Sequence, residues 1–139
     1  MVLVDGQGIP LGVHLSAASA AEVDLAEITL AQVAVPTGRR GRPRMKPDRI
    51  IADRGYVSRP LWERLRRRGI DLIVPPKRNQ RDRYQDGRKL RRYRRRWIIE
   101  RTNAWLLNFR RLTVRYDHQL QHYRAFVYLA CALITLRRF

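Results

Sequence analysis

The chain has 139 residues, enough for one ordinary domain, and 30 basic against 12 acidic residues give a net charge of +18. Its single cysteine, Cys131, excludes an intramolecular disulfide framework and a cysteine-based zinc site. The longest apolar run, residues 125–136, is shorter than the roughly 20 residues that span a bilayer, so we expect a cytoplasmic protein with no membrane partner.

The chain begins with a pattern typical of a β-hairpin. The apolar segments 1–4 and 9–15 flank the turn sequence Asp-Gly-Gln-Gly, in which we interpret Asp5 as a turn residue. An Ala-rich segment then predicts a helix that begins at residue 19 or 20 and ends before Pro36.

The middle of the chain predicts short strands that alternate with helices. Residues 36–47 have the Pro, Gly and Arg content of a loop, and residues 49–52 predict a strand that ends at Asp53. A helix is expected between Ser58 and Gly69, followed by a strand over residues 71–74.

Two long helices complete the predicted fold. A polar loop over residues 77–89 precedes a helix of about 23 residues over 90–112, and a more apolar helix covers 120–136. Because the opening strand pair is a hairpin, we expect an α/β fold with a mixed sheet flanked by helices.

The positive charge is concentrated in one part of the chain. Residues 1–38 contain no Lys or Arg, whereas residues 39–115 contain 27 basic and seven acidic residues. Arg binds phosphate through two parallel hydrogen bonds, so this block favours a nucleic-acid partner, although a GC-rich genome would also raise the Arg content. The candidate phosphate-binding residues are Arg39, Arg40, Arg42, Arg44, Lys46, Arg91, Arg92, Arg94, Arg95, Arg110 and Arg111.

The predicted helix over 90–112 has two different faces on a helical wheel. One face carries Tyr93, Arg96, Glu100, Asn103 and Leu107. The other face is apolar and is expected to pack on the sheet, so we interpret its tryptophans as core residues rather than base-stacking ones; it consists of Leu90, Trp97, Ile98, Ala104, Trp105 and Phe109.

Asp53 and Glu100 are the candidate catalytic acids. Asp53 is expected at the end of a strand, where α/β folds place functional groups, and paired carboxylates in a basic shell suit a hard divalent metal. A two-metal site needs a third acid. The alternative for Glu100 is an ordinary surface ion pair with Arg96, four residues earlier in the helix. His118 and His122 are also four residues apart, but no third ligand is near them in the sequence.

Four segments resemble one known family. They are VDGQGIPLGV (residues 4–13), ADRGY (52–56), QDGRKLRRYRRRWIIERTNAWLLNFRRLTVRY (85–116) and FVYLACALITLRR (126–138). These segments are similar to the C-terminal part of bacterial insertion-sequence transposases of the DDE class. The resemblance implies an incomplete ribonuclease H-like fold and an enzyme that cuts and joins DNA by means of three acids and two Mg²⁺ ions.

The resemblance also assigns roles to residues. Asp53 matches the second acid of the family, and Tyr93, Arg96 and Glu100 match its Tyr-Arg-Glu motif. Leu107 stands where that motif has Lys, and Arg110 or Arg111 are candidates for the role of this Lys.

The first acid and the DNA-binding region of the family lie upstream of the segments matched here. The resemblance therefore implies that residues 1–139 are a partial catalytic domain, inactive by itself. Three origins are open: a decayed copy, a misannotated start, or the downstream half of an element whose two halves are joined by frameshifting. The partners of the chain would be DNA, an upstream-frame half and further copies of itself. The alternative is a non-catalytic basic nucleic-acid-binding protein, in which the two acids are incidental.

Overall fold

The computed structural model describes residues 1–17, 19–78, 85 and 87–138, and it begins with the expected hairpin. Strands β1 (Val2–Val4) and β2 (Pro10–Val13) pair antiparallel. The Asp5 carboxylate accepts hydrogen bonds from the N–H groups of Gln7 and Ile9, each at 2.8 Å. Asp5 therefore shapes the turn, which confirms the structural role predicted for it.

A second pair of strands is connected by a helical segment. Strands β3 (Arg49–Ile51) and β4 (Asp71–Ile73) pair parallel, and the chain between them forms the 3₁₀ helix η1 (Arg54–Tyr56) and α2 (Arg59–Arg67). The Ser58 hydroxyl caps α2 by accepting a hydrogen bond from the Leu61 N–H at 3.3 Å. The predicted strands and helix are confirmed to within about one residue at each end.

The strands do not join into one sheet. Among the described residues, β1–β2 and β3–β4 are two separate two-stranded sheets, so the expectation of a single mixed sheet is wrong for this part of the chain. The α/β class is confirmed. The two sheets share no strand pairing, although β1 and β3 both line one hollow.

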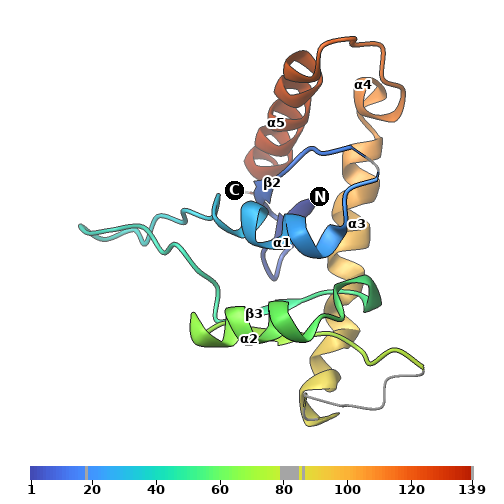
Figure 1. Cartoon of the computed structure of the whole chain (residues 1–139). Coiled ribbons are helices and arrows are strands. Elements are labelled where there is room, and N and C mark those ends of the chain that lie inside the picture. Colours follow the sequence, from blue (N-terminus) through green and yellow to red (C-terminus); the bar gives the residue numbers. More distant parts are fainter. Residues whose placement is uncertain (18, 79–84, 86, 139) are drawn as a thin grey trace.

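The helices form two apolar cores. One core joins α1 (Glu22–Leu30) to α2 and β4 through Leu30, Leu61 and Leu72. The other joins α5 (Leu120–Leu136) to β2. Figure 1 shows the long helical segment that ends in α3 and α4 running beside both sheets, with α5 packed near its C-terminal end. No helix in the described part of the chain is long and apolar enough to cross a membrane.

The single helix expected over residues 90–112 is three helical segments. They are the 3₁₀ helix η2 (Gly87–Arg96), α3 (Trp97–Leu107) and α4 (Arg110–Thr113). Phe109 has an extended backbone, which separates α3 from α4. The six arginines of η2 lie in its 3₁₀ segment, which α3 follows directly. Helix α5 has the predicted bounds. The predicted loop over 77–89 is wrong at its end, because η2 already begins at Gly87. Residues 79–84 and 86 of that loop lie outside the described residues.

The buried side of α3 differs from the predicted apolar face. Its buried residues are Ile98, Thr102 and Leu106, one helical turn apart. The prediction is wrong for Trp97, which is 51% exposed, and for Ala104, which is also exposed. The predicted face omitted Thr102 because this residue is polar. Its buried hydroxyl donates to the Gly8 carbonyl at 2.8 Å and so connects α3 to the hairpin.

Candidate active site

Asp53 lies two residues after the end of β3 and is the N-cap residue of η1. Its Oδ1 atom accepts a hydrogen bond from the Gly55 N–H at 2.8 Å. A Cβ atom added to Gly55 would lie 3.0 Å from Asp53 Oδ1 and 3.1 Å from Glu22 Oε2. The carboxylates of Asp53 and Glu22 therefore converge on the same side of Gly55, and a larger residue there would require both carboxylates to shift by a few tenths of an ångström.

Tyr93, Arg96 and Glu100 share one face, as predicted. The Arg96 guanidinium lies 5.8 Å from the centre of the Tyr93 ring and forms an ion pair with the Glu100 carboxylate. Tyr93 and Arg96 are three residues apart in the 3₁₀ helix, where such residues lie directly above one another. Arg96 and Glu100 are four residues apart across the start of α3, where such residues are neighbours on one face. The three side chains therefore lie on one continuous face. The ion pair considered as the alternative for Glu100 is also present.

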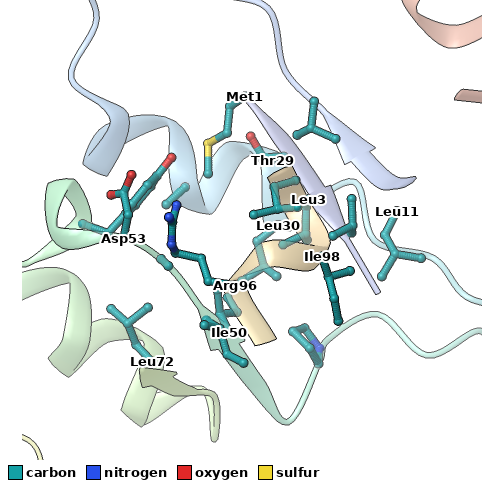
Figure 2. A pocket seen from close by; sticks show the side chains of 18 of the residues that line it. Met1, Leu3, Leu11, Thr29, Leu30, Ile50, Asp53, Leu72, Arg96 and Ile98 are labelled. Carbon is teal, nitrogen blue, oxygen red and sulfur yellow. The ribbon is translucent and has the colours of Figure 1, made fainter. Parts of the chain in front are cut away.

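Asp53 and Glu100 line the same hollow, which has a volume of about 440 Å³. Asp53 comes from the end of β3, Glu100 and Asn103 from α3, and Arg96 from η2. Figure 2 shows the Arg96 side chain directed toward Asp53, with apolar side chains such as Leu3, Ile50 and Leu72 farther along the hollow. Leu107 is 59% exposed and does not line it, so the position that resembles the family's Lys is outside this site.

Glu22 and Tyr56 also line the hollow, and sequence reasoning missed both. Burial, and then the negative charges of Glu22 and Asp53, raise the pKa of Tyr56 to about 12. Glu22 stands in the first turn of α1 together with Asp24, where acidic residues are common because of the helix dipole. Its sequence context therefore indicated only the start of a helix.

The acids present do not make a complete metal site. Within the described ranges, no group of three or more His, Cys, Asp or Glu side chains is arranged to hold a metal ion. Glu22, Asp53 and Glu100 all line the hollow, but they do not form such a group. Asp53 already accepts a hydrogen bond from a backbone N–H, and Glu100 pairs with Arg96. His118 and His122 are both exposed on the surface.

The basic loop over residues 36–47 projects from the body of the molecule (Figure 1). Arg39, Arg40 and Arg42 are exposed along it. Arg44 forms a 2.6 Å ion pair with Asp48, and the Lys46 ammonium donates to the Arg68 carbonyl at 2.7 Å. The last two residues therefore anchor the loop, whereas the first three lie on its projecting part.

The remaining candidate phosphate-binding residues are exposed on η2 and α4. Arg91, Arg92, Arg94 and Arg95 belong to η2, and Arg95 both lines the hollow and donates to the Gly6 carbonyl at 3.3 Å. Arg110 and Arg111 belong to α4 and line a different hollow, together with Tyr116. Arg110 and Arg111 therefore do not line the hollow that contains Asp53 and Glu100.

Similarity to known proteins identifies the family to which the chain belongs. The model of the family described as "Transposase DDE domain" matches residues 1–135 of this chain, and the chain belongs to this family. A Burkholderia cepacia protein named "Putative transposase for insertion sequence element IS402" is 36% identical to it over 140 residues. That match covers 99% of this chain and 63% of the relative, so the chain spans less than two thirds of the relative's length. No solved structure matches the chain.

Proposed function

We propose that this chain is the C-terminal part of an insertion-sequence transposase catalytic domain, with an incomplete ribonuclease H-like fold, that contributes to cutting and joining DNA by phosphoryl transfer. One observation supports this most strongly: Asp53 and Glu100, far apart in the sequence, line one hollow beside Arg95 and Arg96. The family to which the chain belongs agrees with this function.

Each residue of the site has a proposed task. Asp53 and Glu100 would be two of the ligands of the divalent metal, Mg²⁺, that such enzymes use to stabilise charge on the attacking and leaving oxygens. Arg96 orients the Glu100 carboxylate through their ion pair and adds positive charge where a phosphate would enter, while Tyr93 supports the Arg96 guanidinium. Because a third acid is needed and the described residues do not place one suitably, we expect no cutting by the chain alone.

DNA would approach across the basic surfaces. The exposed arginines of the loop over 36–47 and of η2 bind backbone phosphates without reading the sequence, because guanidinium groups recognise phosphate geometry rather than base edges. The complete protein would act as a homo-oligomer on paired DNA ends, and an upstream-frame half would supply what this chain lacks.

A second candidate is a basic nucleic-acid-binding protein without catalysis. Two observations favour it: Glu100 is neutralised by Arg96, and the Asp53 carboxylate caps η1. Both acids then have only structural roles.

A reconstitution experiment separates the two candidates. The chain is mixed with the part of the Burkholderia cepacia relative that lies outside the match, supplied as a separate polypeptide, with Mg²⁺ or Mn²⁺ and DNA carrying insertion-sequence ends. We expect cutting that Asp53→Asn and Glu100→Gln each abolish while DNA binding is retained. Glu63→Gln, an exposed acid on α2 outside the hollow, should leave cutting unchanged. Cutting that survives both site substitutions would exclude the proposed roles, and DNA binding without any cutting would favour the second candidate.

A further inference from the structure

Helix α5 is apolar on two opposite sides. Its inner side packs in the core that it shares with β2 and α3, through buried residues such as Val127 and Ile134. Its outer side carries exposed apolar residues that share one face at about 3.6 residues per turn. We call this face the outer stripe; it consists of Ala125, Leu129, Ala132, Leu133 and Leu136. We propose that the outer stripe receives one amphipathic helix, acidic at both ends, from a second polypeptide that completes the transposase.

The outer stripe is too apolar for a helix face that water covers. Leu129 and Leu136 are 57% and 71% exposed, and residues 125–136 include no charged side chain. A helix that faces water on one side carries polar residues there, whereas a helix that is apolar all round is enclosed by other polypeptide. A contiguous row of exposed apolar side chains therefore marks a surface that a partner covers.

The spacing of the stripe suits a partner helix. Ala125 and Ala132 are seven residues apart, and so are Leu129 and Leu136, so a row of small side chains lies beside a row of large ones. A partner helix can place its own large side chains over the alanine row, in the ridges-into-grooves packing of two helices. From residue 125 to residue 136 the stripe is about 16 Å long, which about three turns of a partner helix would cover.

The start of the chain lies near the C-terminal end of the outer stripe. The Met1 amino group donates to the His14 carbonyl at 2.8 Å, and the adjoining residues Val2 and Val13 pack in the same core as the inner side of α5. Figure 1 shows the N-terminus beside β2, close to the end of α5. A helix with its side chains is about 10–12 Å wide, so a polypeptide joined at residue 1 needs about five extended residues to pass around α5 to the stripe.

The occupant to which we commit is a helix in the part of the longer relative that this chain does not match. The match covers 99% of this chain but 63% of the Burkholderia cepacia protein, so more than a third of that protein has no counterpart here. The inference rests on the proposed function, in which a second polypeptide completes this chain, and it identifies the surface where the two would join.

Charge complementarity favours this occupant over a second copy of the chain. Arg124 precedes the outer stripe and Arg137 and Arg138 follow it, and all three are exposed. No acidic residue occurs in residues 118–138. Two copies of α5 packed stripe to stripe would place arginine against arginine at both ends, whether they run parallel or antiparallel. A partner helix with an acidic residue at each end would pair with these arginines instead.

The outer stripe is separate from the candidate active site. None of its residues lines the hollow that contains Asp53 and Glu100. Helix α5 nevertheless shares a core with Leu106 of α3, the helix that carries Glu100. A partner docked on the stripe would therefore be fixed relative to the site without covering it, and substitutions in the stripe should affect partner binding rather than the chemical step.

Hydroxyl-radical footprinting tests the outer stripe without DNA or metal. The full chain is measured alone and with the part of the relative outside the match, supplied as a separate polypeptide. We expect oxidation of Leu129, Leu133 and Leu136 to fall roughly fivefold or more on addition, because the core of an interface excludes water. Leu120 and Val114 are matched internal controls, because they are 50% and 47% exposed outside the stripe and should change little. In the added polypeptide, the protected residues should be three or four apart; protection of alternate residues would indicate a strand and overturn the proposal.

Paired substitutions provide the second arm, with binding measured by titration calorimetry. Leu129→Gln combined with Leu136→Gln should weaken binding of the added polypeptide roughly tenfold or more, whereas the control pair Leu120→Gln with Val114→Gln should change it little. Equal weakening by the two pairs would overturn the assignment to the stripe. Arg124→Glu should also weaken binding, and more so at low salt than at high salt. Tighter binding by this variant would contradict the acidic ends of the partner.

The remaining outcomes decide between occupants. Failure of the added polypeptide to protect the stripe of the unsubstituted chain overturns the proposal whether or not the variants fold. Protection that rises with the concentration of the chain alone would make a second copy the occupant, and protection only by vesicles of anionic phospholipid would make it a membrane surface; either result overturns the proposal. Stripe protection without DNA cutting would leave this inference standing and refute the proposed function. Cutting without stripe protection would do the reverse.

Discussion

Thr102 offers a quantitative test of how α3, which carries Glu100, is held in place. Its side chain is fully buried, and its hydroxyl donates to the buried Gly8 carbonyl at 2.8 Å. Thr102→Val keeps the shape and removes the donor, which leaves the carbonyl without this partner. Such a loss costs about 1–3 kcal/mol of unfolding free energy.

The assay is urea denaturation followed by circular dichroism, with Thr102→Ser as the matched control. Ser keeps the hydroxyl and loses one methyl group, which costs on the order of 1 kcal/mol. We expect Val to be the more destabilising substitution, although it is the more hydrophobic one. A Thr102→Val variant as stable as the unsubstituted chain would refute the role assigned to this hydrogen bond.

Three further predictions concern α2, Tyr56 and the basic loop. Ser58→Ala removes the cap of α2 and should lower the unfolding free energy by about 1 kcal/mol in the same urea assay, whereas Ser58→Asn should retain most of it. Because the folded pKa of Tyr56 is raised to about 12, its contribution to stability is present below the normal tyrosine pKa of about 10 and is lost as the pH rises through 12. An ultraviolet titration should show that Glu22→Gln lowers this pKa more than Asp53→Asn does; no change in either variant would contradict the convergence of these carboxylates. Replacing Arg39, Arg40 and Arg42 with Gln should reduce the slope of log binding constant against log salt concentration by up to about 3, equally for unrelated DNA sequences, and an unchanged slope would show that the loop does not contact phosphate.

Local patterns predicted most of the elements. Asp5 before two glycines indicated the hairpin, Ser58 and Gly69 bounded α2, and the apolar run before Arg137 indicated α5. Each of these depends on the chemistry of a few neighbouring residues, such as a cap, a turn or a helical period.

Features that depend on distant contacts were not predicted. The separation of the sheets depends on which strands meet, and the buried position of Thr102 depends on the Gly8 carbonyl, 94 residues away in the sequence. The family motif located Asp53 and Glu100, but the approach of Glu22 to Asp53 follows from the packing of α1 against η1. No local pattern encodes that contact.

Iron-directed cleavage of the polypeptide tests most directly whether Asp53 and Glu100 form one metal centre. The chain, mixed with the part of the relative that lies outside the match, is loaded with Fe²⁺ in place of Mg²⁺ and exposed to ascorbate and peroxide, so that radicals cut the backbone near the bound ion. We predict cuts near both residue 53 and residue 100, and the loss of both cuts in either Asp53→Asn or Glu100→Gln. Cleavage near only one of these residues, or near neither, would contradict a shared centre.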